Sequence, residues 1–474
     1  MDRSASTKTM SPSGEQADVS RRRFLSTSLL AGGAGLGLGE ILRLQSQAAE
    51  RGQTSPDTAV IQIWLGGGPS QFETFDPKPL APTEIRGPYG SIATKLPGVR
   101  VCEMLPLTAA VLDKTAIIRS FTHPYDDHFG VMRWCLGGRR ESNNANGYPS
   151  LGSIASRYRG PCQPGMPPYV LLSEEMVMHH HLFDANGPGY LGASHSPFMV
   201  MQDPYPHGFQ SDRLRDATGN LKLADDVTLE RIDDRKSLLA ELDRLPRQLD
   251  SKVVQNELDP FTRLALEMVT SSKARRAFDL KEESSETRSR YGSHRWGQMA
   301  LLARRLVESG VTFVTLNTAP DCLRWDWHAS ITRENRPQPD AGGPNVGMEY
   351  DGPPLDRALA ALIADLSERD SCRNVLLVVW GEFGRTPRVN PRGGRDHWPR
   401  LGNVLLAGGG LNMGQVIGKS SPDGGLPDDR PIGPNDVLAT LYKHLAIDPH
   451  QNAVNLQGRP IALQDNGQAI HELF

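Results

Sequence analysis

Short apolar runs alternate with amphipathic stretches along most of the chain. Each run is bounded by Gly, Pro or polar residues, a pattern that predicts a buried strand. We expect such strands at residues 59–65, 115–119, 169–172, 311–317, 374–380 and 401–406. Helical periodicity predicts helices at residues 129–136, 287–309, 355–369 and 435–446, with another after Ser150. This alternation predicts an α/β fold, in which helices sandwich a mostly parallel sheet.

Two long segments interrupt the alternation. Residues 226–310 are rich in charge and have helical periodicity, with Leu238, Leu242 and Leu245 on one face. This spacing predicts a helical insertion that packs on the sheet domain. Residues 183–212 are rich in Gly, Pro, Asn and Asp, which predicts a long loop.

The N-terminus predicts export. Residues 20–25 read Ser-Arg-Arg-Arg-Phe-Leu, which matches the twin-arginine pattern, and a Gly/Ala/Leu-rich run and small residues follow. We expect residues 1–48 to be a signal peptide that the twin-arginine machinery reads, leaving one domain at residues 58–474. The mature protein would then be periplasmic or secreted. The alternative is an ordinary basic tail.

Composition excludes several classes of partner. The net charge is −3 and no basic stripe with interleaved aromatic residues occurs, so nucleic acid is not an expected partner. No second apolar run has the length of a membrane span, so we expect no transmembrane segment in the mature protein. The five cysteines form no CxxC motif and predict neither a thiolate zinc site nor a disulfide framework.

Polar side chains gather directly after four of the expected strands. In chain order the clusters contain Ser70 and Asp76; His123, Asp127 and His128; Asp326 and His328; and Glu382, Arg385, Asp396 and His397. In an open α/β sheet the carboxyl ends of the strands form the ligand-binding edge, and right-handed crossovers bring these ends together. Because His and carboxylates are common metal ligands, the clusters predict a metal or catalytic site at this edge.

Each cluster also has a purely structural interpretation. Glu382 and Arg385 could form a buried ion pair that stiffens a turn. Ser70 and Asp76 are residue types that commonly form turns and helix caps. In the third cluster, the neighbouring tryptophans could pack while Asp326 and His328 face solvent.

Several longer motifs resemble a bacterial secreted family known only as domain of unknown function 1501. They are Trp-Leu-x-Gly-Gly-x-Ser from residue 64, Thr-Phe-Asp-Pro-Lys from 74, Trp-Asp-x-His from 325, Gly-Glu-Phe-Gly-Arg-Thr-Pro from 381 and Gly-Gly-Arg-Asp-His-Trp-Pro from 393. The resemblance covers nearly all of residues 58–474. It implies the fold of the alkaline phosphatase and sulfatase superfamily and often a twin-arginine signal, as here. No activity is established for the whole family.

The chain retains some of the residue types that the superfamily carries at its site and replaces others. Residues 381–384 look like its Ser-Asp-His-Gly metal motif, in which Glu382 keeps a carboxylate but Phe383 cannot bind a metal. His128 falls where sulfatases carry their nucleophile, and the formylglycine pattern is absent. Glycines at 66 and 67 replace the acidic pair that follows the first strand. The Asp/His residues from the third and fourth clusters are similar to the superfamily's second metal set.

The first functional hypothesis is a metal-dependent hydrolase of a phosphate or sulfate ester, such as one on a glycan. Its divalent cation, of the Zn, Ca, Mg or Mn class, would be held by Asp326, His328, Glu382 and His397. His128 or Ser70 would act as nucleophile or base, and Arg385 would bind the anion. Asp396 would orient His397, and Asp127, Asp76 and His123 would support the ligands or bind the substrate.

The second hypothesis is a non-catalytic binding protein. The replaced glycines, Phe383 and the missing sulfatase nucleophile would then mark a chain that kept the fold and lost the chemistry. Such a protein would bind a glycan or an exported partner in the former catalytic cleft.

Overall fold

The computed structural model of the chain describes residues 57–140, 147–174, 179–202, 271–319, 323–333 and 346–474. The predicted signal peptide and residues 203–270, which include most of the predicted insertion, lie outside these ranges. None of the described helices combines the length and the apolar character that a membrane span requires.

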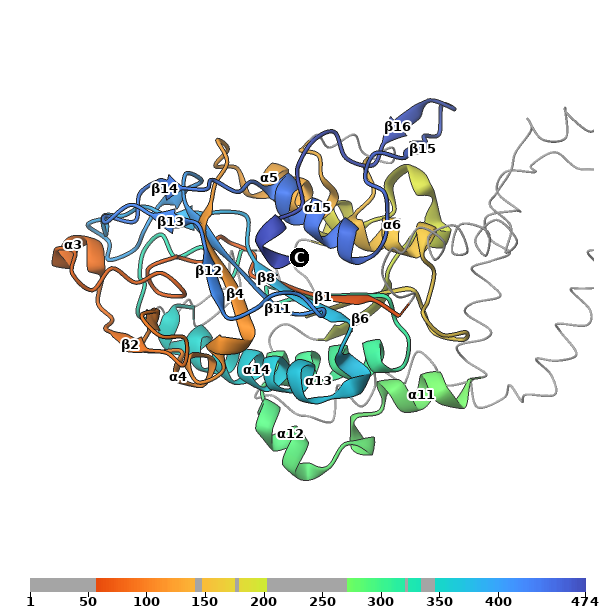
Figure 1. Cartoon of the computed structure of the whole chain (residues 1–474), viewed down its shortest axis with the longest axis horizontal. Helices are drawn as coiled ribbons and strands as arrows, with labels where there is room; N and C mark the ends of the chain where they lie inside the picture. The colour runs from red at the N-terminus through yellow and green to blue at the C-terminus, as the bar shows by residue number, and fades with distance from the viewer. Residues whose placement is uncertain (1–56, 141–146, 175–178, 203–270, 320–322, 334–345) are drawn as a thin grey trace, which may run out of the picture. The chain divides into compact units, whose positions relative to one another are not determined.

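The described residues form one central sheet of eight strands (Figure 1). In sheet order they are β12 (Gln415–Ile417), β4 (Thr115–Phe121), β11 (Gly402–Gly408), β8 (Val375–Trp380), β1 (Ala59–Trp64), β7 (Phe313–Asn317), β5 (Tyr169–Glu174) and β6 (Phe198–Gln202). Every neighbouring pair that excludes β11 is parallel. The predicted α/β fold with a mostly parallel sheet is therefore confirmed.

Strand β11 is antiparallel to both of its neighbours, β4 and β8. The chain leaves β8 at Trp380 and re-enters the sheet at Gly402 without forming a helix on the way. A return without a crossover helix brings the next strand back beside the first in the opposite direction. The connection from β8 to β11 therefore stays at the edge of the sheet where the polar clusters lie.

Helices cover both faces of the sheet, as expected. One layer contains α13 (Arg295–Glu308) and α14 (Met348–Glu368), and the other contains α5 (His128–Gly137), α6 (Leu151–Tyr158) and α15 (Pro434–His444) (Figure 1). Helix α13 packs on α14, β7 and β1. Residues 295–308, at the end of the predicted insertion, thus belong to the layer on the sheet, and the extent of the insertion stays a prediction.

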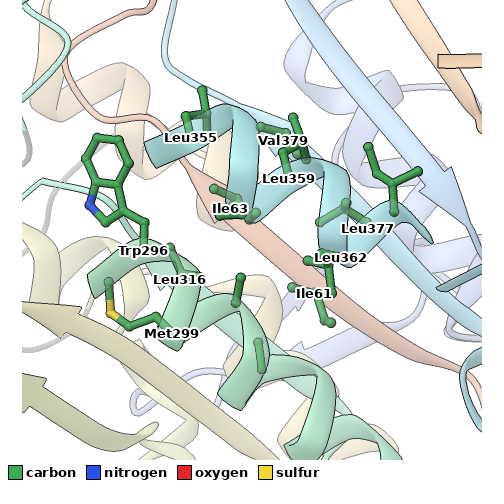
Figure 2. Packing of buried hydrophobic residues seen from close by; sticks show 14 of the residues in the cluster. Ile61, Ile63, Trp296, Met299, Leu316, Leu355, Leu359, Leu362, Leu377 and Val379 are labelled. Carbon is green, nitrogen blue, oxygen red and sulfur yellow. The ribbon is translucent and has the colours of Figure 1, made fainter. Parts of the chain in front are cut away.

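The two faces of each central strand belong to separate hydrophobic cores. Ile61 and Ile63 of β1 and Leu377 of β8 face the core under α13 and α14, where they pack with Leu359 (Figure 2). The alternating residues, such as Trp64, face the core under α5, α6 and α15. Because side chains alternate between faces along a strand, a strand buried on both faces is apolar at most of its positions, as β1 is apart from Gln62. This explains why the continuous apolar runs predicted the central strands.

Shorter elements surround this core. They are α3 (Thr83–Arg86), β2 (Ser91–Ala93), β3 (Arg100–Cys102), α4 (Pro106–Ala109), α7 (His179–Asn186), α11 (Ser272–Phe278), α12 (Ser285–Tyr291), β9 (Gly384–Arg385), β10 (His397–Trp398), β13 (Lys419–Ser420), β14 (Pro427–Asp429), β15 (Asn452–Val454) and β16 (Pro460–Ala462).

Three sequence predictions about elements were wrong. The single helix expected at residues 287–309 is divided into α12 and α13, because α12 ends at Tyr291 before Gly292. The described part of the expected loop at 183–212 contains the end of α7 and the strand β6. Helix α14 begins at Met348 and not at residue 355, although Pro353 and Pro354 lie inside it. Gly347 and Asp351 form the first turn, in which the Asp351 carboxylate accepts from the Gly347 N–H. Pro353 and Pro354 are the sixth and seventh residues of α14, so each removes one hydrogen bond of the helix, and the helix continues past them.

Candidate metal site

Three of the four polar clusters converge at the carboxyl ends of β4, β7 and β8. His128 begins α5, Asp326 and His328 follow β7, and Glu382 follows β8. His397 arrives on a small hairpin, in which β10 pairs with β9 and places His397 opposite Arg385. Parallel strands that end at one edge therefore gather side chains that are far apart in the sequence.

Asp326 lies at the centre of the site. Its Oδ1 lies 2.9 Å from Nε2 of His328 and 3.3 Å from Nε2 of His397. Its Oδ2 lies 3.5 Å from Nε2 of His128. The Nε2 atoms of His328 and His397 are themselves only 2.9 Å apart. His128, Asp326 and His397 each offer a ligand atom within 4.8 Å of the other two, which is close enough to hold one cation. Nε2 of His328 lies beside Asp326 and His397 at the edge of this group.

The outer nitrogen of each imidazole has a partner that fixes the ring. Nδ1 of His128 lies 2.6 Å from Oε1 of Glu382, and Nδ1 of His328 lies 2.9 Å from Oδ1 of Asp396. Nδ1 of His397 lies 2.8 Å from the carbonyl oxygen of Asp126. Since a carbonyl or carboxylate oxygen accepts, we assign the hydrogen of each neutral ring to Nδ1. The three Nε2 atoms then present lone pairs to the centre, as metal-binding histidines do.

The electrostatics of the site favour an added positive charge. Burial lowers the pKa of His128, but Asp326 and Glu382 outweigh burial and raise this pKa to about 9. The pKa of His328 is raised mainly by Asp326. Burial raises the pKa of Asp326, but the three imidazoles and Arg385 outweigh it and hold that pKa far below its usual value. Two lone pairs 2.9 Å apart beside a carboxylate repel each other unless a proton or a metal cation lies between them.

The site is open on one side. His128 and Asp326 are mostly buried, whereas the side chains of His328 and His397 are 34% and 23% exposed. On the buried side, the ring of Phe383 packs against His128 and His397, with centroids 5.0 and 4.7 Å away. Among the described residues, the exposed edges of His328 and His397 are where a small molecule could approach the converging atoms.

The contacts of Glu382 and His128 differ from those that their predicted roles require. Glu382 was the predicted ligand, but its Oε1 accepts from the Gly67 N–H and contacts the outer nitrogen of His128. His128, the predicted nucleophile, instead points its Nε2 to the centre. That Nε2 is buried and has no hydrogen-bond partner among the described residues. The geometry makes His128 the better candidate for a ligand and Glu382 the group that orients it.

Arg385 lies beneath the site and not at its open side. The side chain is 1% exposed, and its Nη2 donates to Oδ1 of Asp326 at 2.6 Å. Its Nε donates to the carbonyl of Gly68 at 2.8 Å. These contacts hold Asp326 in place and leave the guanidinium little access to the substrate anion that it was predicted to bind. Arg385 is therefore a positioning residue in this geometry.

The first polar cluster lies apart from the converging atoms. Ser70 is buried and donates its hydroxyl hydrogen to Glu73, which pairs with Arg395 at 2.9 Å. Asp76 is buried and forms ion pairs with Lys78 at 3.0 Å and with Arg119 at 3.4 Å. The proposed roles of Ser70 and Asp76 stay predictions, and their contacts in the structure are those of structural residues.

The remaining predicted residues flank the site. Nε2 of His123 donates to the carbonyl of Glu382 at 2.6 Å, and burial lowers the pKa of His123. Asp127 caps α5 by accepting from the Gly130 N–H at 2.8 Å. Asp396 lies behind His328, not behind His397 as predicted. Each of the three thus positions the site from outside, and substrate contacts for them stay predictions.

Three groups that support the site were not predicted from the sequence. Nδ2 of Asn390 donates to Oδ1 of Asp396 at 3.3 Å, and the carbonyl of Asp126 fixes His397. Gly67 has φ +107°, and a Cβ there would lie 2.5 Å from the backbone nitrogen of Asp326. The Gly-rich stretch after the first strand was the available signal for Gly67, since such positions permit close backbone approach. No sequence signal marks a backbone carbonyl.

Several solved structures resemble this fold at low sequence identity. The PsFucS1 sulfatase from Pseudoalteromonas sp. is 11% identical with a TM-score of 0.38, and the match covers 86% of this chain and 70% of that one. The phosphonate monoester hydrolase SpPMH from Silicibacter pomeroyi is 12% identical with a TM-score of 0.39, covering 87% and 76%. The lipoteichoic acid synthase LtaP from Listeria monocytogenes is 10% identical with a TM-score of 0.35, covering 86% and 75%.

Of the two comparisons made with the sequence alone, one found a match. No curated protein matches the chain. One family model matches residues 57–474, which is most of the chain, in agreement with the motifs at 64, 381 and 393. The chain belongs to the family described as "Protein of unknown function (DUF1501)".

Proposed function

We propose that this protein is an exported, metal-dependent hydrolase that acts on a phosphate or sulfate ester, such as one carried by a glycan. The observation that supports it is the convergence of three imidazole nitrogens on Asp326, with every outer nitrogen already engaged. The ester class follows from the resemblance to the alkaline phosphatase and sulfatase superfamily. Export follows from the twin-arginine pattern in residues 20–25.

The donor set favours zinc over the other cations considered. His128, His328 and His397 offer nitrogen, and Asp326 offers one or both carboxylate oxygens. Imidazole suits Zn²⁺ and similar transition metals, whereas Ca²⁺ and Mg²⁺ prefer oxygen ligands. The orphaned Nε2 of His128 supports the fit, because a buried polar atom without a partner is costly unless a ligand satisfies it.

A divalent cation at this position supplies Lewis acidity, which polarises the ester bond and stabilises charge on the transferred group. The chain itself contributes orientation. Glu382 and Asp396 hold two of the imidazoles, Arg385 holds Asp326, and Phe383 excludes water from the buried side. Among the described residues, no Ser, Thr or Cys side chain hydrogen-bonds to the converging atoms, so a water from the open side is the nucleophile in this proposal.

Metal analysis combined with ester hydrolysis tests the proposal. The full chain should retain one zinc ion or a similar metal, and His328→Ala and His397→Ala should each lose it. Hydrolysis of aryl phosphate or aryl sulfate should stop on chelation and return with added metal. The exposed His450→Ala is the matched control, because it removes an imidazole outside the site and should keep both metal and activity.

The outcomes separate the two functional hypotheses. Retained metal without hydrolysis across a broad panel of phosphate and sulfate esters would favour the non-catalytic binding protein. A protein that binds no transition metal, or two His variants that keep it, would overturn the proposed site itself. Circular dichroism of each variant would show that loss of metal is not loss of fold.

A further inference from the structure

A cavity lies beside α5 and outside the candidate metal site. Its volume is about 410 Å³. Its walls are formed by α5 and the turn that follows, by the start of α15 and by the chain near residue 465, and α5 and α15 pack side by side (Figure 1). The lining residues are Tyr125, Asp127, Gly130, Arg133, Trp134, Gly138, Arg139, Arg140, Asn435, Asp465 and Asn466.

Helix α5 separates this cavity from the metal site. Successive residues of an α-helix advance by about 100°, so Gly130, Arg133 and Trp134 all point well away from His128. The side of α5 that His128 shares carries Val131 and Cys135, which are buried in the core. The metal site and the cavity therefore lie on opposite sides of one helix.

The lining predicts a polar ligand. Apart from two glycines, every lining residue has a charged, amide or aromatic side chain, and none is aliphatic. A cavity for a lipid or another apolar molecule would be lined mainly by aliphatic and aromatic groups. The mixture found here offers hydrogen-bond donors and acceptors around a small aromatic surface.

Two arginines are held rigid at the cavity wall. The guanidinium of Arg140 lies 3.7 Å from the ring centroid of Tyr125, and Arg140 also pairs with Asp127. The guanidinium of Arg139 lies 4.4 Å from the ring centroid of Tyr148 and pairs with Asp465. Stacking on a ring and pairing with a carboxylate fix each guanidinium before a ligand arrives, which reduces the entropy lost on binding.

Arg133 gives the cavity an excess positive charge. The two lining carboxylates each pair with one arginine, so three guanidinium groups face two carboxylates. Nε of Arg133 donates one long hydrogen bond, 3.4 Å, to the carbonyl of Arg140. No carboxylate among the described residues pairs with Arg133. One negative group on a ligand would neutralise this excess positive charge. A guanidinium can bind such an oxyanion with two parallel hydrogen bonds.

The lining also supplies an aromatic surface and amides. The Tyr125 side chain is 40% exposed, and its ring meets Trp134 edge-on with centroids 5.7 Å apart. Nε1 of Trp134 donates to Oδ1 of Asn435 at 2.8 Å, which fixes the indole. Fixed rings present flat apolar area to the C–H face of a sugar, while Asn435 and Asn466 can bond to hydroxyl groups.

We propose that this cavity binds an acidic sugar unit, a saccharide that carries one carboxylate or one sulfate group. Arg133 would hold the oxyanion, the amides would bond to hydroxyls, and the ring of Tyr125 or Trp134 would face the sugar. The cavity is a binding site without chemistry of its own. It does not rest on the proposed hydrolysis, because none of its lining residues is a candidate metal ligand.

Binding to three matched tetrasaccharides tests this inference. The full chain, with EDTA present, is titrated calorimetrically with a uronate-bearing, a sulfated and an uncharged tetrasaccharide. We expect at least one acidic sugar to bind about tenfold more tightly than the uncharged one, with an affinity that falls as salt is added. The two acidic arms show whether the carboxylate or the sulfate is the preferred group.

Variants assign the binding to the cavity. Arg133→Gln should weaken binding of the acidic sugar about tenfold, since a charged hydrogen bond is lost. Arg133→Lys should retain part of the affinity because it keeps the charge without the bidentate geometry. The exposed Arg459→Gln is the control for loss of one positive charge elsewhere and should bind like the parent.

Three outcomes would overturn the inference: no binding of either acidic sugar, equal binding of the uncharged sugar, or unchanged affinity in Arg133→Gln. Binding that disappears in His328→Ala would place the sugar at the metal site and would also overturn it. Failure of ester hydrolysis leaves this result untouched, because binding is measured without metal. The two proposals can therefore fail separately.

Discussion

One buried carboxylate, Glu382, contacts the outer nitrogen of His128, whose Nε2 faces the centre of the candidate metal site. The carboxylate is 1% exposed, and its Oε1 is shared between the Gly67 N–H and the imidazole of His128. A carboxylate behind a ligating imidazole fixes the ring and makes its inner nitrogen a stronger donor. If the proposed site binds a metal, Glu382 would control its affinity without contacting it.

Replacement of Glu382 tests this orienting role. Glu382→Gln keeps the size of the side chain but removes the charge that strengthens the bond to His128. We expect metal affinity to fall about 10–100-fold, which is typical for loss of such an outer partner. Competition with a chromophoric chelator measures the change.

The control for this substitution is Glu368→Gln. Glu368 is 59% exposed and pairs with Lys114, so its replacement alters one surface carboxylate far from the site. Metal affinity of the control should equal that of the parent. If Glu382→Gln also binds metal as the parent does, the orienting role is wrong. Complete loss equal to that of His328→Ala would instead restore Glu382 as a ligand, as the sequence predicted.

At the residue scale, the sequence predicted which side chains lie close together better than how they are oriented. His and Asp after strand ends were visible in the pattern, and Asp326, His328 and His397 do converge. The sequence could not show that Glu382 lies behind the ring of His128, because this depends on which nitrogen of the imidazole meets the carboxylate. That choice is set by the distance between the β8 end and the start of α5, which no local pattern encodes.

At the scale of elements, the strands were predictable because the central ones are buried on both faces. Val375 to Trp380 is buried at every position, and this burial requires an unbroken apolar run. The direction of β11 was not predictable, since an apolar run has the same composition in either direction. Strand β6 at the sheet edge was missed because Gly, Pro and polar residues surround its short apolar run.

Leu377 offers a test of this double burial. It is fully buried on β8 and packs against α14 in the core shown in Figure 2. Leu377→Ala should lower the free energy of unfolding by about 2–5 kcal/mol, because burial is lost and a cavity remains. Chemical denaturation followed by circular dichroism measures the change. The same substitution at Leu107, which is 48% exposed, is the control and should stay within about 0.5 kcal/mol. Equal effects at both positions would contradict the assigned burial.

At the scale of the whole molecule, a buried histidine joins one helical layer to the central sheet. His444 ends α15, and its Nε2 donates to the carbonyl of Ala59 at the start of β1, 3.1 Å away. This bond joins the last helix to the first strand. The ring is 1% exposed, and burial lowers the pKa of His444 to about 4. Burial likewise lowers the pKa of His195 and of His294 to about 4.

These buried histidines predict that stability falls in mild acid. In the unfolded chain a histidine has a pKa of about 6.5, whereas in the folded chain the pKa of these three is about 4. Below pH 6.5 the unfolded chain therefore binds protons that the folded chain does not bind. The contribution is fully present above pH 6.5 and is lost as the pH falls from 6.5 towards the folded value of about 4. Within that window each such histidine lowers the free energy of unfolding by about 1.4 kcal/mol per pH unit.

His444→Gln isolates one of these contributions. Glutamine can still donate to the carbonyl of Ala59 but does not titrate, so the variant should lose stability less steeply between pH 6.5 and 5, by about 1.4 kcal/mol per unit. Urea denaturation at several pH values, with chelator present to remove effects of bound metal, gives both profiles. The exposed His450→Gln should give a profile parallel to that of the parent. A parallel profile for His444→Gln as well would mean that His444 takes up its proton in the folded state, and that the junction of α15 with β1 admits water.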